Sequence, residues 1–310
     1  MVSFHAREVA ERLDYSSLID ALEEGFRGDI NIPSRHHHVL PAVGKRDATM
    51  LLMPAWNSNF VGLKTVVVEP ENTKRGLPAV QANYQLMDRE TGKLLAYIDG
   101  AELTARRTAS ASALASRYLS RPDARCLAMV GTGVLAPHLI RAHATQRTID
   151  EVVIWGRDID KAQQVVEKMM GSAYTVRAEA VLEKAVGSAD IISCATLTTV
   201  PLIAGNWITP GQHLDLVGAF TPEMREVDDK VISVAEVYID TEDVKHSVGE
   251  IKDPLECGII GEEHILGTLA DLAAGRVDRP RSSSSAVTLF KSAGTALEDL
   301  IAASLVYSRA

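Results

Sequence analysis

The sequence predicts an α/β protein of two domains, one built on a doubly wound parallel sheet and the other on an α+β arrangement. Between residues 126 and 240, short apolar runs alternate with segments of helical periodicity, which is typical of parallel strands joined by crossover helices. Between residues 48 and 100, strand-like runs follow one another directly, as in an antiparallel sheet. A chain of 310 residues is also long enough to form two hydrophobic cores.

The N-terminal part of the chain predicts helices followed by strands. Residues 7–27 carry apolar residues at helical intervals, and "DYSS" offers an N-cap for a second short helix. The runs "ATMLLMPAW", "FVGLKTVVVEP" and "ANYQLMDRETGKLLAYIDG" are strand-like, and the turn "DRETG" predicts a hairpin. The Ala-rich stretch 103–120 predicts a long helix that joins the two domains, with Thr104 as its N-cap.

The remaining elements follow from the same periodicities. The strands of the parallel sheet are expected at "CLAMVG", "EVVIWG", "TVRAEA", "DIISCAT", "HLDLVGAF" and "EVYID". Residues 262–275, "EEHILGTLADLAAG", look helical. The closing stretch "SSSSAVTLFKSAGTALEDLIAASLVY" predicts one more strand and a final helix.

The composition excludes several classes of partner. A net charge of −9 and a pI near 5.5 argue against nucleic acid or an anionic membrane surface, since those partners require clustered Lys and Arg. Cys126, Cys194 and Cys257 form no CxxC pair, and they are expected to be reduced. The chain shows neither a signal peptide nor an apolar run of about 20 residues. We therefore expect a cytoplasmic protein with a small-molecule partner.

A glycine-rich turn follows the first predicted parallel strand. Gly131, Gly133 and Ala136 form the pattern G-x-G-x-x-A: the first glycine permits the tight turn, the second lets a pyrophosphate approach the backbone, and the alanine allows close helix packing. A purely structural turn is the alternative. The position after a strand and at the start of a helix, with further such units behind it, favours a Rossmann-type dinucleotide-binding domain.

The end of the next strand bears on which nicotinamide cofactor is bound. An NAD site needs an acidic residue there for the ribose 2′-hydroxyl, but Gly156 and Arg157 occupy the position. A guanidinium beside glycine suits a 2′-phosphate, so NADP(H) is favoured over NAD(H). Asp158 lies one residue further on and leaves NAD(H) open. Arg157 as a solvated turn residue is the other alternative.

Three cations are candidates for an anion-binding or catalytic site. Lys64 lies inside the apolar strand "FVGLKTVVV", where a lysine is rarely tolerated without a carboxylate partner, unless it protects a sheet edge. Arg106 and Arg107 lie at the start of the Ala-rich helix, where the helix dipole disfavours a cation. At least one of them should contact a carboxylate or a phosphate, although surface arginines on helices are common.

Metal and hydrolytic sites receive little support. In "SRHHH" only His36 and His38 point to the same side of an extended segment, and no further ligand is evident, so no metal is expected. Ser247 and Glu250 have no His or Asp partner that the sequence places at triad spacing.

Five stretches together resemble the ornithine cyclodeaminase/μ-crystallin family: "GLKTVVVEPENTKRGLP", "LTARRTASASALASRYL", "VGTGVLA", "VGAFTPEMREVDD" and "LFKSAGTALEDL". They extend over nearly the whole chain in order. The resemblance implies a homodimer, a substrate-binding and dimerisation domain over 1–118 with 285–310, and a Rossmann dinucleotide-binding domain over 119–284.

The resemblance also assigns residues to roles. Arg35 and Arg107 would bind the substrate carboxylate, and Lys64 would contact the substrate and polarise or protonate the reacting group. The residues that would line the cofactor, beside Gly131 and Arg157, are Thr108, Ser112, Gly133, Val134, Leu135, Thr196 and Ser292. The implied substrate is an amino acid or a cyclic imine.

One departure from the family pattern separates its activities. Cyclodeaminases carry an Asp two residues before the proline of the "VGAFTPEMRE" loop, and this chain has Phe220 there. Without that carboxylate, deamination lacks its general base. The chain therefore resembles more closely the reductases of Δ1-pyrroline-2-carboxylate and Δ1-piperideine-2-carboxylate, which form proline and pipecolate. An ornithine cyclodeaminase and a non-catalytic NADP(H)-binding protein are the alternatives.

Overall fold

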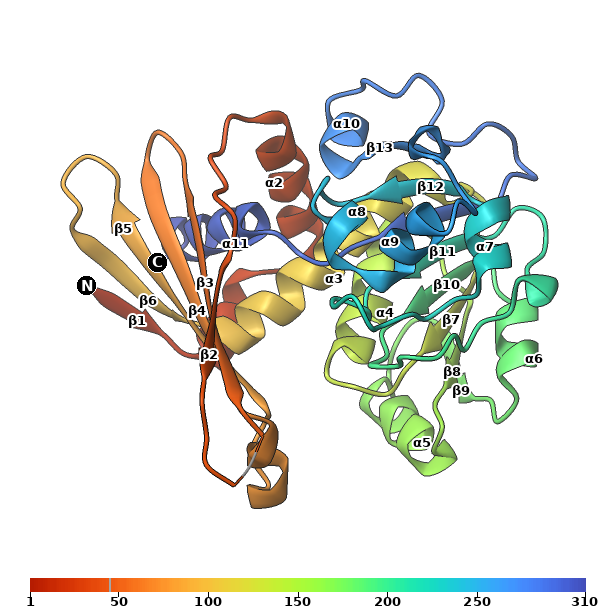
Figure 1. Cartoon of the computed structure of the whole chain (residues 1–310), viewed down its shortest axis with the longest axis horizontal. Coiled ribbons are helices and arrows are strands. Elements are labelled where there is room, and N and C mark those ends of the chain that lie inside the picture. The colour runs from red at the N-terminus through yellow and green to blue at the C-terminus, as the bar shows by residue number, and fades with distance from the viewer. Residues whose placement is uncertain (45) are drawn as a thin grey trace. The chain divides into compact units, whose positions relative to one another are not determined.

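In the computed structural model, which describes residues 1–44 and 46–310, the chain divides into two compact units, drawn in Figure 1. The first unit consists of Met1–Thr108 and Thr295–Ala310, and the second of Ala109–Gly294. Each contains its own sheet. The predicted α/β class with a Rossmann-type parallel sheet is confirmed.

Among the described residues of the first unit, six strands form one sheet in the order β1-β6-β5-β4-β3-β2. The elements are β1 (Val2–Phe4), α1 (Ala6–Arg12), α2 (Tyr15–Arg27), β2 (His36–Leu40), β3 (Ala48–Trp56), β4 (Phe60–Val68), the 3₁₀ helix η1 (Pro70–Arg75), β5 (Val80–Asp88), β6 (Leu94–Asp99) and α11 (Ala296–Ser308). The two predicted N-terminal helices and the β5–β6 hairpin are confirmed. Asp14 caps α2 by accepting a hydrogen bond from the Ser17 amide.

The first sheet has one covered and one open face. Helix α11 packs against β3, β4 and β5 and lies beside α2. Strand residues alternate between the faces, so Lys64 and Val66 point toward α11 and are buried, while Thr65 and Val67 point to the other face and are half-buried. The final helix of the chain thus completes the core of the N-terminal unit.

Helix α3 (Gly100–Leu119) begins three residues earlier than the sequence predicts. The Asp99 carboxylate accepts a hydrogen bond from the Glu102 amide at 2.8 Å, which makes Asp99 the N-terminal capping side chain. Thr104 lies inside the helix, and the expectation that it caps the helix is wrong. Asp99, at the end of β6, supplies the capping carboxylate, so the helix begins upstream of Thr104.

The second unit, whose residues 109–294 are all described, has eight parallel strands in the order β13-β12-β14-β11-β10-β7-β8-β9. Its strands are β7 (Cys126–Val130), β8 (Glu151–Trp155), β9 (Thr175–Ala178), β10 (Ile191–Cys194), β11 (His213–Leu216), β12 (Glu236–Ile239), β13 (Ile265–Thr268) and β14 (Thr288–Lys291). Its helices after α3 are α4 (Leu135–Gln146), α5 (Ile159–Lys168), α6 (Leu182–Gly187), η2 (Gly205–Trp207), α7 (Asp229–Val234), α8 (Val244–Ser247), α9 (Gly249–Glu256), η3 (Glu262–His264) and α10 (Leu269–Ala273).

The order of strands in this sheet reverses at β7. From β7 the chain adds β8 and β9 on one side, and then β10 and β11 on the other. In doubly wound sheets the ligand binds outside the carboxyl ends of the strands at this reversal. The glycine-rich turn, which follows β7, lies at that position.

Two expectations about the chain's organisation differ from the structure. Strand β14 pairs with β11 and β12, so residues 285–294 belong to the second unit and not to the first. The other boundary falls inside α3, after Thr108, and not at residue 118.

The segment 262–275 is not one helix. Strand β13 occupies its middle and pairs with β12, and α10 starts only after Thr268, whose hydroxyl accepts a hydrogen bond from the Asp271 amide. The capping pair restarts the helix, while the sheet edge takes up the apolar residues before it.

Candidate functional site

The glycine-rich turn has the geometry of a phosphate cradle. Gly131 has φ +120°, and a Cβ there would lie 2.5 Å from the Ala195 carbonyl oxygen, so a side chain is excluded on two grounds. A Cβ at Gly133 would meet nothing within 4 Å among the described residues. Ala136 is buried, and its amide donates to the Gly133 carbonyl at 3.1 Å. The first glycine is required by the fold, whereas the second leaves room beside the backbone for a ligand.

The loop after β8 lies against this turn. A Cβ at Gly156 would lie 2.6 Å from Cγ2 of Thr132, so the two loops are in close contact. Arg157 is exposed. The Asp158 carboxylate caps α5 by accepting from the Asp160 amide at 3.0 Å. The arginine side chain is thus open to an anion, and the aspartate is engaged by its own helix.

Further predicted cofactor residues follow parallel strands at the same edge of the sheet. Thr196 comes after β10, and Ser292 comes directly after β14 and donates its amide to the Leu216 carbonyl at 3.1 Å. Val134 and Leu135 begin α4, with Val134 exposed. Thr108 and Ser112 are buried residues of α3. The structure therefore brings Gly131, Thr196 and Ser292 to one edge of the second unit.

A buried ionic cluster lies in the first unit. Lys64 Nζ on β4 is 2.7 Å from Oδ2 of Asp299 on α11. Arg107 Nε on α3 is 2.9 Å from Oδ1 of the same carboxylate, and its Nη1 is 2.5 Å from Oε2 of Glu298. The four side chains are at most 6% exposed. Two cations and two anions thus balance their formal charges inside the core.

The surroundings of Lys64 lower the pKa of its ammonium group to about 8, because burial and the nearby Arg107 charge outweigh the opposing effect of Asp299. Burial alone would raise the pKa of Asp299, but Arg107 and Lys64 outweigh it, so this pKa is lowered and the carboxylate stays ionised. A lysine with this pKa gives up a proton near neutral pH far more readily than an exposed one.

The structure decides two of the alternatives left open by the sequence. Strand β4 lies between β5 and β3, so Lys64 is not on a sheet edge and is paired with a carboxylate. Both arginines near the start of α3 contact carboxylates: Arg107 as above, and Arg106 through Glu102 at 2.6 Å. Arg35 is half-buried, one residue before β2, and its role stays a prediction.

Sequence reasoning missed the two carboxylates and a tyrosine. Glu298 and Asp299 lie in the first turn of α11, whose sequence "ALEDLIAASLV" is otherwise apolar. Acidic residues in such an apolar helix require cationic partners, so the sequence pattern alone could have predicted a buried ion pair here. Tyr84 is fully buried opposite Lys64 in the β4–β5 register, and burial followed by the Asp299 charge raises the pKa of its hydroxyl. Its location depends on strand register, which the sequence does not reveal.

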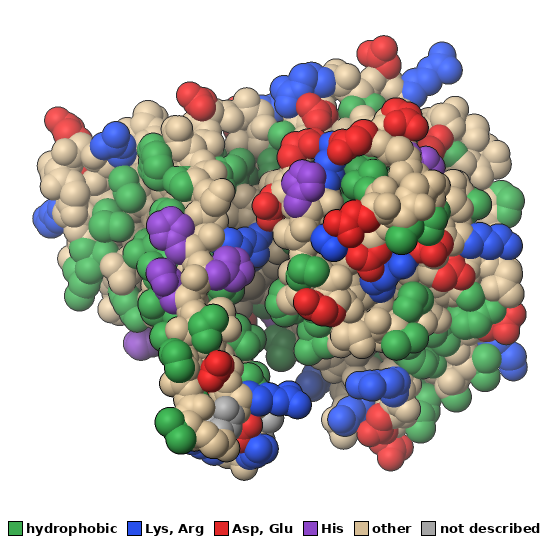
Figure 2. All heavy atoms as spheres, in the orientation of Figure 1, with side chains coloured by type: hydrophobic (Ala, Val, Ile, Leu, Met, Phe, Trp, Pro, Cys, Tyr) green, Lys and Arg blue, Asp and Glu red, His purple; other side chains and the backbone are tan. Residues whose placement is uncertain are grey.

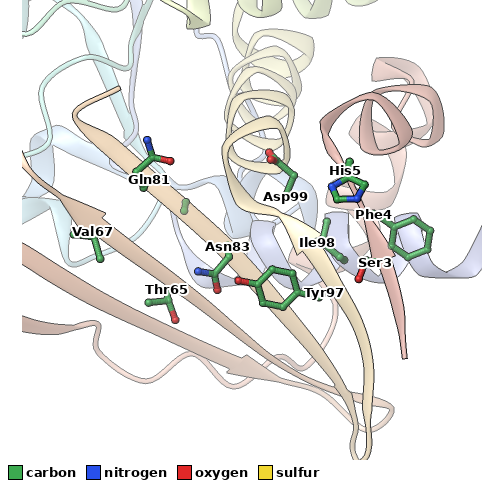
Figure 3. A pocket seen from close by; sticks show the side chains of 11 residues that line it. Ser3, Phe4, His5, Thr65, Val67, Gln81, Asn83, Tyr97, Ile98 and Asp99 are labelled. Atoms are coloured by element: carbon green, nitrogen blue, oxygen red, sulfur yellow. The ribbon is translucent and has the colours of Figure 1, made fainter. Parts of the chain in front are cut away.

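A separate cavity of about 320 Å³ lies on the open face of the first sheet (Figure 3). Thr65, Asn83 and Tyr97 line it from neighbouring strands. Because Thr65 alternates with Lys64 along β4, this cavity and the ionic cluster are on opposite faces. The cavity is therefore separate from the cluster around Lys64.

The surface and the histidine segment add further observations. Figure 2 shows acidic and basic side chains interspersed over the visible face, and histidines grouped on the first unit. His36 and His38 approach edge to face, with ring centroids 6.4 Å apart. In the described part of the chain, no three His, Cys, Asp or Glu residues form a metal-binding group, and no helix is long and apolar enough to cross a bilayer.

Comparisons with known proteins extend over the whole chain. A protein of Schizosaccharomyces pombe described as uncharacterized is 41% identical over 318 residues, covering 98% of this chain and 96% of that protein. A Δ1-pyrroline-2-carboxylate reductase of Colwellia psychrerythraea is 35% identical over 309 residues, covering 98% of each.

A solved structure agrees with the fold throughout. The Δ1-pyrroline-2-carboxylate reductase of Thermococcus litoralis, in complex with NADH and L-proline, matches with a TM-score of 0.93 at 30% identity and covers 100% of this chain and 97% of that one. The model of the ornithine cyclodeaminase/mu-crystallin family matches residues 2–310. The chain belongs to the ornithine cyclodeaminase/mu-crystallin family.

Proposed function

We propose that the chain is an NADPH-dependent reductase of cyclic imino acids, which converts Δ1-pyrroline-2-carboxylate or Δ1-piperideine-2-carboxylate to proline or pipecolate. The observation that carries the proposal is the buried Lys64–Asp299 pair, in a chain 35% identical over its length to a Δ1-pyrroline-2-carboxylate reductase. Reduction of a C=N bond needs one hydride at carbon and one proton at nitrogen. A lysine whose pKa is lowered to about 8 is suited to supply that proton.

Each residue of the cluster has a distinct part in this reaction. Arg107, held by Glu298 and Asp299, has a fixed orientation and would bind the substrate carboxylate together with Arg35. Lys64 would donate its proton to the imine nitrogen and regain one from water. Asp299 keeps the ammonium charged in a buried setting, since its negative charge raises the pKa that burial lowers. A nicotinamide cofactor, when bound, supplies the hydride.

The second unit would hold that cofactor, and we propose that NADPH is preferred. The space at Gly133 and the tight turn at Gly131 suit a pyrophosphate. Arg157 is exposed at the end of β8, and Asp158 is engaged in capping α5. A carboxylate used as an N-cap is poorly placed to accept the ribose hydroxyls of NADH, whereas the guanidinium suits the 2′-phosphate of NADPH.

We also propose that the first unit forms a homodimer through its open sheet face. Met50, Leu52, Leu63 and Val67 lie on the face opposite α11 and are only half-buried. Apolar side chains that are incompletely covered on a sheet face favour a protein partner. Sedimentation of the purified protein gives its mass in solution, and a monomer at micromolar concentration would contradict this proposal.

One paired assay tests the proposed activity. NADPH oxidation is followed with Δ1-pyrroline-2-carboxylate, and ammonia release is followed with L-ornithine. The reductase proposal expects the first and not the second. Ammonia release without NADPH oxidation would identify a cyclodeaminase, and NADPH binding without either reaction would identify a binding protein.

A further inference from the structure

Glu226 makes an unusual set of contacts at the cofactor edge of the second unit. Its side chain is fully buried, and it lies on none of the strands. Oε1 accepts hydrogen bonds from the Thr196 amide at 2.7 Å and the Thr196 hydroxyl at 2.8 Å. Oε2 accepts from the amides of Gly218 at 2.8 Å and Ala219 at 3.4 Å. One carboxylate therefore joins the loops that follow β10 and β11.

The packing around this carboxylate leaves no room for adjustment. A Cβ at Gly218 would lie 2.0 Å from the Thr196 carbonyl oxygen and 2.5 Å from Oε1 of Glu226. The two loops thus touch through their backbones at this point. A closely packed interior has no space for an additional atom, so the contact between Gly218 and Thr196 requires glycine at position 218.

A second buried carboxylate holds Glu226 itself. Glu250 on α9 accepts from the amides of Glu226 at 2.8 Å and Val227 at 3.0 Å. The Glu226 carbonyl in turn accepts from the amides of Leu202 and Ile203. The backbone of Glu226 is therefore fixed from both sides, and its side chain has a defined direction.

The hydrogen bond to Glu226 determines whether the Thr196 hydroxyl can donate or accept a hydrogen bond with a ligand. Its hydroxyl has one proton, and that proton is donated to Glu226. The half-buried hydroxyl can then only accept a hydrogen bond from a ligand. A carboxamide NH₂, such as that of nicotinamide, is a donor of the required kind.

We propose that Glu226 is a positioning residue for the nicotinamide end of the cofactor, holding the loops after β10 and β11 together and making Thr196 an acceptor for the carboxamide. The inference rests on the proposed function, since it assumes that a nicotinamide cofactor binds at this edge. Phe220 follows Ala219 in the loop after β11, so the same carboxylate also holds the main chain next to Phe220. We expect Glu226 to govern the orientation of the nicotinamide and not the affinity for the cofactor.

The first experiment uses Glu226→Gln, which keeps the shape but places an NH₂ donor against protein donors. The turnover number should fall about 10- to 100-fold while the NADPH dissociation constant changes by less than about threefold. Emission of bound NADPH, which reports the nicotinamide environment without turnover, should lose much of its enhancement. Glu223→Gln, the same change at an exposed residue of the same segment, should match wild type in each measurement.

Two variants of Thr196 test the inference even if the Glu226→Gln protein does not fold. Thr196→Val removes the acceptor and should lower the turnover number about tenfold, whereas Thr196→Ser keeps it and should stay within about threefold of wild type. Equal turnover and equal NADPH emission in wild type and Thr196→Val would overturn the inference, as would a Glu226→Gln protein that loses only thermal stability. A wild-type chain that binds NADPH but reduces no imine would contradict the proposed function, and the emission comparison would still decide the role of Glu226.

Discussion

Lys64 and Asp299 form a buried ion pair, 2.7 Å between Nζ and Oδ2, that joins the middle of the first sheet to the last helix of the chain. Taking both charges out of water is costly, and a hydrophobic pair of similar volume stabilises a core at least as well. The pair is therefore better explained by chemistry than by stability. Its effect is to hold an ammonium group in a fixed place with a pKa lowered to about 8.

Replacing Lys64 by Met should abolish most imine reduction without unfolding the protein. Arg107 still contacts Asp299 in the variant, and Met fills a similar volume, although one negative charge of the cluster loses its counter-ion. Loss of a general acid predicts a fall of about 10²- to 10⁴-fold in the turnover number with NADPH and Δ1-pyrroline-2-carboxylate. NADPH fluorescence titration should show unchanged binding. Lys93→Met, at an exposed position of the turn between β5 and β6, is the matched control. Turnover near wild type in Lys64→Met would rule out the catalytic role.

The pH dependence of reduction should follow the protonation of Lys64. The active form is protonated, so the turnover number should fall about tenfold per pH unit above a pKa of about 8. Asp299 raises this pKa, and Asp299→Asn should therefore move the alkaline limb to lower pH. Breaking a buried pair costs about 3–5 kcal/mol, so melting temperature is measured alongside.

Glu298→Gln serves as a milder variant in the same pH experiment. Glu298 contacts Arg107, and its charge also raises the pKa of Lys64, so the limb should move in the same direction by a smaller amount. An alkaline limb that stays in place in both variants would mean that another group titrates.

How much of this arrangement the sequence predicts depends on whether the information is local. The parallel strands, the turn at Gly131 and the capping of α2 by Asp14 depend on periodicity and on residues a few positions apart, and these predictions are confirmed. Lys64 and Arg107 were identified because a cation in an apolar strand or at a helix start needs an anion. The sequence shows that these two cations need anionic partners, but it does not show which residues the partners are.

The missed features depend on tertiary contacts. Asp299 is far from Lys64 in sequence, and only the docking of α11 on β4 brings the two together. The strands β1 and β13 have three and four residues, and each exists because a neighbouring strand pairs with it. Glu226 carries no local pattern that reveals its four hydrogen bonds to two other loops.

The two glycines of the turn should respond differently to alanine. Gly131→Ala adds a Cβ at φ +120° and 2.5 Å from a carbonyl oxygen, so it should lower the melting temperature by several degrees, corresponding to about 1–3 kcal/mol. Gly133→Ala meets open space and should melt like wild type, yet raise the NADPH dissociation constant about tenfold or more, since the methyl group would take up the space proposed for the pyrophosphate. Calorimetry and fluorescence titration measure the two effects. Wild-type NADPH affinity in Gly133→Ala would place the cofactor elsewhere.

Arg157 should determine the preference for NADPH. Arg157→Ala removes the cation that we propose for the 2′-phosphate, and the loss of hydrogen bonds to a charged group, about 1.5–3 kcal/mol, predicts a 10- to 100-fold rise in the Michaelis constant for NADPH. The constant for NADH, which lacks that phosphate, should change little. Lys168→Ala removes an exposed cation from the last turn of α5 and should leave both constants unchanged. Parallel increases for both cofactors in Arg157→Ala would contradict the preference.

Phe220 should separate reduction from deamination. It is 49% exposed in the loop after β11, directly behind the clamped Ala219, and a phenyl ring accepts no proton and orients no water. The wild-type protein should therefore reduce a cyclic imine and release little or no ammonia from L-ornithine.

Phe220→Asp should weaken reduction and gain at most slight deamination, because a carboxylate without supporting hydrogen bonds rarely acts as a base. Phe220→Leu, which stays apolar, should keep most of the reductase activity. If wild type converts L-ornithine to proline and ammonia as fast as it reduces the imine, the carboxylate is dispensable and the reductase assignment is wrong.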